Sequence, residues 1–169
     1  MNKAAVIQKI LEVLRSELET YVRAAKFSHA EATAEENRAE NKYDTRGLEA
    51  SYLAAGQANK VAELESALET FEGLKEQPAS DVVEIGSLIE LQQDGFVEWY
   101  FVGPTAGGTE IEIDDTEVKR IKAPRAGKSV LVITPESPLG SQIMGLEAGA
   151  KASLELGGQT QKAVVQAVL

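Results

Sequence analysis

Three carboxylates lie around a break in the longest helical pattern of this 169-residue chain. Glu40, Asp44 and Glu49 belong to the stretch AENKYDTRGLEASYLAAGQ, residues 39–57, in which the Asp-Thr and Arg-Gly steps interrupt residues that otherwise favour helix. Carboxylate oxygens are good ligands for hard cations such as Mg²⁺. An acidic residue at the start of a helix can equally cap it or interact with its dipole. The residues alone leave both roles open.

Charge and composition exclude several classes of protein. The formal net charge is −10, and no cluster of Lys and Arg provides the footprint that direct binding of a nucleic-acid backbone requires. There are no cysteines, which excludes disulfides and agrees with a reducing cytoplasm. No apolar run is long enough to span a membrane, and the charged start is unlike a signal peptide. We therefore expect a cytoplasmic protein that does not enter the membrane.

The first half of the chain has helical periodicity in two blocks. From Asn2 to about Lys42 and again from about Leu48 to Glu76, apolar residues recur at steps of three and four. A helix of roughly 40 residues is on the order of 60 Å long and needs a partner along its length. The pattern predicts an antiparallel hairpin over residues 1–77 with its tip near 43–48. The predicted contact stripe is Val6, Ile10, Leu14, Leu18, Tyr21 and Ala25 on one helix, and Leu48, Tyr52, Ala55, Val61, Leu64, Leu68 and Phe71 on the other.

The predicted stripe becomes smaller toward the tip, where alanines replace Ile, Leu and Phe. Small side chains allow two helices to approach closely, so we expect a slender finger there. Gly56 lies inside the second helix, where it costs about 1 kcal/mol relative to Ala. Tyr21 and Tyr52 are interpreted as packing residues of the hairpin. Such a thin, long element suits a probe better than a scaffold.

Residues 81–169 have the pattern of a small, mostly antiparallel β domain. Glycines punctuate six short runs rich in β-branched and aromatic residues, and Gly107-Gly108 and Gly157-Gly158 have the composition of hairpin turns. One short helix is predicted between the fourth and fifth strands. Trp99, Tyr100 and Phe101 are consecutive in one strand, so alternation predicts that one of them fills the core and that another marks a docking surface. The fold class is therefore α+β, a helical hairpin followed by a β domain, joined through QPAS at 77–80.

The C-terminal stretch VITPESPLGSQIMGLEAGAKASLELGGQTQKAVVQAV resembles the signature of the bacterial Gre transcript-cleavage factors. In that family a Ser-Pro pair precedes a short helix and a glycine turn, followed by two closing strands. Ser137-Pro138, Gly140, Ile143-Met144-Gly145 and Gly149 fall on the pattern, whereas Leu146 and Ala150 depart from it. Family members join a long antiparallel helical hairpin to an FKBP-like β domain, which is the layout that periodicity predicts here.

The resemblance implies a function at bacterial RNA polymerase. Gre factors insert the hairpin into the secondary channel while the β domain docks on its rim, which would assign docking to Ser137, Pro138, Leu139, Ile143 and Met144. Their tip carboxylates stimulate the polymerase's own endonuclease on backtracked RNA by helping to hold Mg²⁺ and water. On this reading the protein is not itself an enzyme, has no cofactor of its own and acts as a monomer. It meets nascent RNA only through the polymerase.

The tip differs from the family pattern, which reads G-D-L-x-E-N-A-E-Y with two acids three residues apart. Here Asp44 corresponds to the first acid, but Gly47 occupies the place of the second and Glu49 lies five residues on. Asp44, with Glu49 as the weaker partner and Glu40 as a third acid in reach, would share one Mg²⁺ only in the polymerase complex. The alternative is a secondary-channel regulator that binds without promoting cleavage. An independent prolyl isomerase is disfavoured because the β domain has few aromatic residues for a pocket.

Overall fold

The computed structural model describes residues 1–33, 46–93, 95–112 and 126–169. The chain forms two compact units, one comprising residues 11–69 and the other comprising residues 1–10 together with residues 70–169. The first unit consists of helical segments, and the second contains a six-stranded mixed sheet. The structure therefore confirms the predicted α+β class, in which a helical pair precedes a small β domain.

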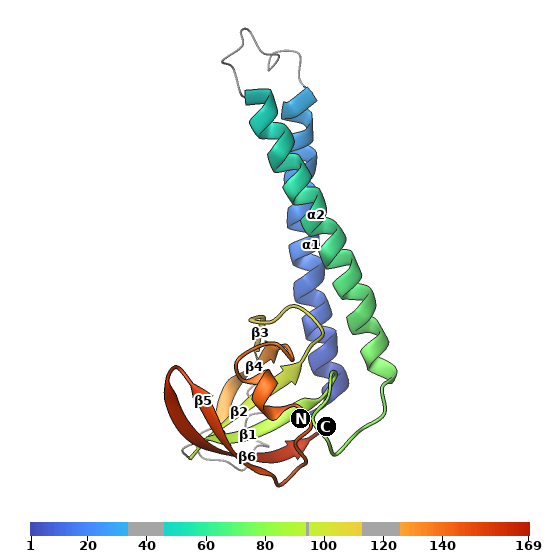
Figure 1. Cartoon of the computed structure of the whole chain (residues 1–169). Helices are drawn as coiled ribbons and strands as arrows, with labels where there is room; N and C mark the ends of the chain where they lie inside the picture. The colour runs from blue at the N-terminus through green and yellow to red at the C-terminus, as the bar shows by residue number, and fades with distance from the viewer. Residues whose placement is uncertain (34–45, 94, 113–125) are drawn as a thin grey trace. The chain divides into compact units, whose positions relative to one another are not determined.

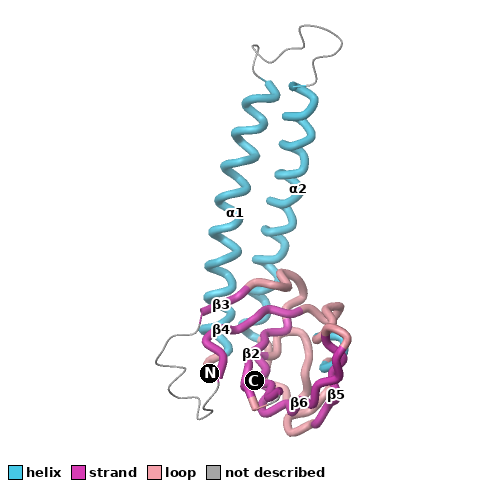
Figure 2. Tube along the Cα trace, turned by 90° about the vertical axis from the view of Figure 1, so that its left-hand side faces the viewer, coloured by secondary structure: helices cyan, strands magenta, loops and turns pink. Residues whose placement is uncertain are grey.

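The helical unit is formed by helix α1 (Lys3–Thr33) and helix α2 (Arg46–Gly73). The two helices run side by side in both views of the molecule (Figures 1 and 2). Helix α1 begins at Asn2, whose side-chain Oδ1 accepts a hydrogen bond from the Ala4 N–H over 3.0 Å. This bond satisfies one of the free donors at the helix start. The segment joining the helices, residues 34–45, lies outside the described residues.

Burial along both helices follows steps of three and four. Leu11 and Leu14 on α1, and Leu64 and Ala67 on α2, are buried. Positions at the same steps closer to residues 34–45 carry side chains that are half-buried or small. Steps that alternate between three and four residues are typical of the contact line between two helices, which we call the seam. The seam positions are 11, 14, 18, 21, 25, 28 and 32 on α1, and 50, 54, 57, 61, 64 and 68 on α2.

This seam corrects the predicted stripe at the start of α2. Leu48 and Tyr52 were expected between the helices, but their side chains are 56% and 72% exposed. Stepping back from Phe71 through Leu64 by threes and fours reaches Ala54 and Ala50, which lie well around the helix from Tyr52. The large buried residues in the other half of α2 fix which side of this helix faces α1. Toward residues 34–45 that side carries alanines, which therefore occupy the seam.

A groove of ≈ 580 Å³ lies between the helices in their tip half, which we define as residues 20–33 and 46–60. Its walls carry mostly small side chains. The lining residues are Ala25, Lys26, His29, Ala32, Thr33, Ser51, Ala54, Ala55 and Ala58.

The β unit contains one sheet with strand order β3-β4-β2-β1-β6-β5. All neighbouring strands are antiparallel except β2 and β4, which are parallel. All six predicted strands are present and the sheet is mostly antiparallel, as expected. The strands are β1 (Leu88–Gln93), β2 (Phe96–Val102), β3 (Glu110–Glu112), β4 (Ala126–Ile133), β5 (Lys151–Leu156) and β6 (Gln159–Val168).

The two predicted glycine hairpins have different outcomes. Gly157 and Gly158, with φ of 58° and 79°, join the paired strands β5 and β6 and form the expected two-residue turn. Gly107-Gly108 does not close a hairpin, because the strands on either side of it, β2 and β3, are not neighbours. Strands β2 and β3 instead pair with the two edges of β4, so residues 103–109 cross over the position that β4 occupies in the sheet.

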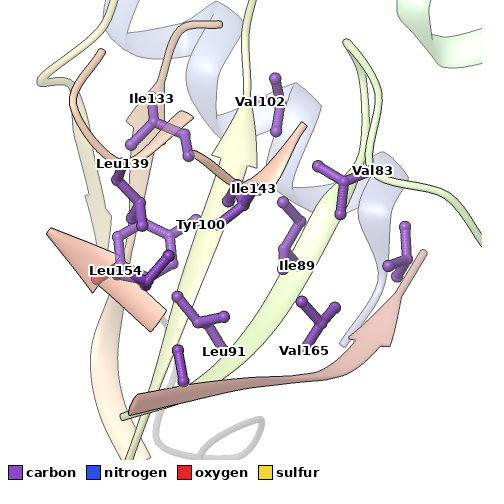
Figure 3. Close-up of a cluster of buried hydrophobic side chains, with 12 residues drawn as sticks. Val83, Ile89, Leu91, Tyr100, Val102, Ile133, Leu139, Ile143, Leu154 and Val165 are labelled. Carbon is purple, nitrogen blue, oxygen red and sulfur yellow. The ribbon is translucent and has the colours of Figure 1, made fainter. Parts of the chain in front are cut away.

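Both faces of the sheet are covered. One face carries an apolar cluster that includes Ile89, Leu91 and Tyr100, closed by Leu139 and Ile143 from the segment after β4 (Figure 3). On strand β2 the neighbouring aromatic residues Trp99 and Phe101 alternate to the opposite face. Phe96 at the start of the strand is half exposed, whereas Trp99, Tyr100 and Phe101 are all buried. The expectation that one of them marks an exposed docking surface is therefore wrong.

The opposite face of the sheet is covered by the ends of the two helices that belong to the β unit. The Phe71 ring, near the end of α2, lies 6.0 Å from the Phe101 ring between centroids, and both side chains are fully buried. Near the start of α1, Lys9 Nζ donates a hydrogen bond to the Glu112 carbonyl over 2.9 Å. The 3₁₀ turn η2 (Leu74–Glu76) then ends the helical segment. The predicted boundary at 77–81 follows sequence elements, whereas these compact units divide within both helices.

Candidate functional site

Of the predicted tip acids, Glu49 alone lies within the described residues. It is exposed in the first turn of α2, where a carboxylate interacts favourably with the helix dipole. Glu49 has an interaction partner within the chain. Asp44 and Glu40 lie outside the described residues, so their predicted proximity to Glu49 stays a prediction.

Side-chain hydrogen bonds to the backbone lie in the helical turns on either side of residues 34–45. Thr33 Oγ1 donates to the His29 carbonyl over 2.9 Å, and Ser51 Oγ donates to the Gly47 carbonyl over 2.8 Å. Both are local bonds to the preceding turn, which Ser and Thr form readily inside helices. They hold the hydroxyls against the backbone rather than presenting them for chemistry.

The predicted docking segment begins with a hydrogen-bonded turn at Ser137. Its Oγ accepts the Gly140 N–H over 3.0 Å and donates to the Thr134 carbonyl over 2.8 Å. The Ser137 carbonyl also accepts the Ser141 N–H over 2.9 Å. These bonds form a turn that contains Pro138 and leads into the helix, whose N-cap residue is Leu139. Helix α4 (Gly140–Ile143) follows directly, which confirms the predicted short helix.

Gly140 is required by close approach of the backbone. A Cβ atom at this position would lie 2.0 Å from the Thr134 carbonyl oxygen and 2.9 Å from Ser137 Oγ. The turn is therefore folded tightly against the end of β4. We refer to residues 134–144 as the serine-proline turn.

The predicted docking residues divide by exposure. Leu139 and Ile143 are buried in the sheet core, Pro138 is exposed, and Ser137 and Met144 are half-buried. The first two side chains hold the serine-proline turn on the sheet. Any direct contact of this turn with a partner would use Pro138 and Met144, together with the exposed Ser141.

Gln142 is a structural residue that the sequence reasoning missed. Its side-chain amide accepts the Glu155 N–H over 2.7 Å and donates to the Glu155 carbonyl over 3.1 Å. The same amide donates to the Pro138 carbonyl. Gln142 thus joins the serine-proline turn to strand β5. The sequence does show a polar residue beside Ile143. It does not show that this side chain hydrogen-bonds to strand β5, which is a separate element later in the chain.

A second candidate is a small cavity of ≈ 200 Å³ on the sheet, lined by Glu98, Trp99, Tyr100, Glu110, Ser129 and Leu131. Tyr100 OH donates a hydrogen bond to Glu98 Oε2 over 2.5 Å, and Ser129 Oγ donates to Glu110 Oε1. Burial raises the pKa of Tyr100, and the hydrogen bond and charge of Glu98 raise it further. Each hydroxyl thus has a carboxylate as its acceptor, and the raised pKa disfavours ionisation of the Tyr100 phenol.

Two features are absent from the part of the chain that the structure describes. It has no group of three or more His, Cys, Asp or Glu side chains arranged to hold a metal ion. None of its helices combines the length and apolar character needed to cross a membrane. Glu49 alone offers a Mg²⁺ ion too few oxygen ligands, so further ligands would have to come from undescribed residues or from a partner.

Comparisons with known proteins give similarities to solved structures, three of which follow. The chain is 18% identical to GreA factor homolog 1 (Gfh1) of Thermus thermophilus, covering 98% of this chain and 94% of that one with a TM-score of 0.33. For Gfh1 of Thermus aquaticus the values are 20%, 99%, 96% and 0.37. A structure described as the transcription factor Gfh1 gives 19%, 98%, 92% and 0.34. No family model and no curated protein matches the chain, and TM-scores in this range do not establish a family.

Proposed function

We propose that this protein binds bacterial RNA polymerase as a Gre-like factor, with its hairpin entering the secondary channel. The observation that carries the proposal is the order of the two elements, a hairpin of α1 and α2 followed by a sheet with the serine-proline turn. This is the layout implied by the C-terminal sequence resemblance. The protein would then act in the cytoplasm without a cofactor of its own, and would meet RNA only through the polymerase.

Within that function we propose stimulation of transcript cleavage by Asp44, with Glu49 as its partner. The two carboxylates would add oxygen ligands to a Mg²⁺ ion of the polymerase, which would supply the activated water. The endonuclease itself would remain that of the polymerase. The β unit would contact the polymerase through Pro138 and Met144, which are accessible, while Leu139 and Ile143 position the serine-proline turn from within the core.

One observation favours the alternative, a regulator that binds without promoting cleavage. Glu49 lies within helix α2, in its first turn, and already has an interaction partner in the chain. A Mg²⁺ shared with Asp44 would be added to that interaction or would replace it. A factor with this arrangement would compete with cleavage factors for the channel and leave the transcript intact.

A cleavage assay on stalled, backtracked polymerase separates the two candidates. Wild-type protein should shorten the RNA, Asp44→Ala should reduce the rate at least tenfold, and Glu49→Ala should reduce it less. Binding of each variant to polymerase is measured in parallel. Full-length RNA at saturating wild-type protein would establish the noncleaving alternative, and a wild-type protein that does not bind polymerase would contradict both.

A further inference from the structure

Helix α2 presents an uncharged, apolar face to solvent near the tip. Tyr52 and Leu48 are its largest members, at 72% and 56% exposed. Helical geometry places them on the side of α2 away from the seam together with four smaller residues, of which Ala55 also borders the groove between the helices. We call this the neutral face, and it consists of Leu48, Tyr52, Ala55, Gly56, Asn59 and Ala62, all exposed.

The neutral face is unlike the solvent-exposed faces elsewhere in the hairpin unit. The exposed residues of α2 that follow it include Glu63, Glu65 and Glu69, and those of α1 include Glu17 and Arg23. A helix face that meets only water is normally polar or charged. A stripe of four turns that carries no charge of its own, with a Tyr and a Leu projecting from it, is the pattern of a contact surface, bordered here by Glu49 and the Lys60–Glu63 ion pair.

Gly56 supplies an independent argument. A Cβ atom added at this position would meet nothing within 4 Å, so no close packing within the chain requires a glycine there. Glycine inside a helix is nonetheless destabilising relative to alanine. Gly56 weakens the helix and gives no space to another group of this chain. Its presence is explained if the backbone or an aromatic ring of a partner approaches the helix closely at that point.

The size of the neutral face decides between two occupants. Fifteen residues of helix span about 22 Å, and a helix is about 10 Å across, so the footprint is on the order of 200 Å². A stable complex buries roughly 800 Å² on each partner. The face is therefore too small to hold a second copy of this chain by itself. It suits a partner that is already anchored by another part of the protein.

We infer that the neutral face packs against an uncharged protein surface of the polymerase channel wall, with Tyr52 as the anchor and Gly56 as the point of closest approach. This inference rests on the proposed function. It attributes binding affinity to the side of the hairpin rather than to its acidic residues. Leu48 continues directly from the predicted tip, so a hairpin that enters a channel carries this face in with it. The contact would set residence time independently of cleavage.

Opposite effects of one substitution on stability and on affinity test the inference. Gly56→Ala should raise the thermal unfolding midpoint of the free protein because alanine favours helix, yet weaken binding to polymerase at least fivefold. Tyr52→Ala should weaken binding about tenfold without destabilising the protein. The matched control is Gly73→Ala at the other end of α2, where a Cβ likewise meets nothing within 4 Å, and this variant should bind like wild type.

Binding of the full chain to polymerase is measured by fluorescence anisotropy, and self-association by sedimentation. Wild-type binding with unchanged affinity for both Gly56→Ala and Tyr52→Ala would overturn the inference while leaving the proposed function intact. Failure of the wild type to bind polymerase would remove the proposed function and this occupant together. A homodimer that Tyr52→Ala disrupts would overturn the inference in favour of a second copy. Cleavage by Gly56→Ala at saturating concentration should equal that of wild type.

Discussion

The β unit and the tip half of the hairpin place their large apolar side chains in opposite positions. In the β unit Phe71, Phe101 and Tyr100 are inside, and both faces of the sheet are covered. In the tip half the seam carries mainly alanines, while Phe27 and Tyr52 are more than half exposed. The first arrangement stabilises the molecule by burying apolar area. The second leaves that area available, which is the arrangement expected of a surface whose partner lies outside the chain.

The largest expected effect contrasts two phenylalanines. Phe71→Ala should lower the free energy of unfolding by about 3–5 kcal/mol, because it empties a fully buried site beside Phe101. Phe27→Ala, at a side chain 66% exposed, should change it by less than about 0.5 kcal/mol. Urea unfolding measures both. Equal losses would show that Phe27 stabilises the chain and that the contrast between the two regions is wrong.

Two glycines should respond with opposite signs. Gly140→Ala should destabilise by about 1–3 kcal/mol, because its Cβ would meet the Thr134 carbonyl oxygen at 2.0 Å. Gly56→Ala should stabilise by up to about 1 kcal/mol, since its Cβ meets nothing in the chain. Thermal unfolding of the two variants gives the comparison. A neutral Gly140→Ala would mean that the serine-proline turn moves freely away from strand β4.

A smaller effect is expected at the cap of the serine-proline turn. Ser137→Ala removes the acceptor for the Gly140 N–H and should cost about 1 kcal/mol. Ser141→Ala is the control, because Ser141 is exposed and its side chain makes only a 3.5 Å contact to the Pro138 carbonyl. Urea unfolding of the pair should show a loss for the first variant alone. If both variants are neutral, the turn is held entirely by Leu139, Ile143 and Gln142.

The smallest effect concerns pH. Burial and Glu98 raise the pKa of Tyr100 in the folded chain, so the folded state favours the protonated phenol. The resulting stability is fully present below the ordinary tyrosine pKa of about 10 and is lost as pH rises above it. Tyr100→Phe removes this titration and keeps the ring in the core.

Urea unfolding at pH 9 and pH 11 measures the difference. Wild type should lose about 0.5–1 kcal/mol more than Tyr100→Phe over this interval, a value reduced by partial solvent screening. Identical losses in the two proteins would show that Tyr100 ionises in the folded chain as it does in water, and that the Glu98 hydrogen bond does not hold the phenol protonated.

The β strands were predictable because their signals are local. Runs of β-branched and aromatic residues between glycines define β1 to β6, and the Gly157-Gly158 turn contains its own positive φ angles. The parallel pairing of β2 with β4 was not predictable from such signals. It depends on residues about 30 positions apart, and Gly107-Gly108 has hairpin composition whether or not its neighbours pair.

The prediction that residues of the neutral face lie between the helices was wrong for a different reason. Leu48, Tyr52 and Ala55 recur at steps of four and three, as do the true seam residues, so periodicity alone does not choose between them. Steps back from Phe71 that alternate between three and four residues stay on one side of the helix, and they would have chosen the alanine seam and left Tyr52 outside. Glu49 and the serine-proline turn were locatable from sequence, but the burial of Leu139 and Ile143 depends on a sheet assembled from distant strands.

The coverage of the sheet by helix ends has a practical consequence for recombining such proteins. Residues 1–10 and 70–73 belong to the β unit, where Phe71 and Lys9 contact the strands. A chimera joined at the loop after residue 77 would give the sheet a foreign cover and expose Phe101 to mismatched packing. Chimera junctions placed inside both helices, near residues 10 and 70, would exchange the hairpin and keep the native helix ends that cover the sheet.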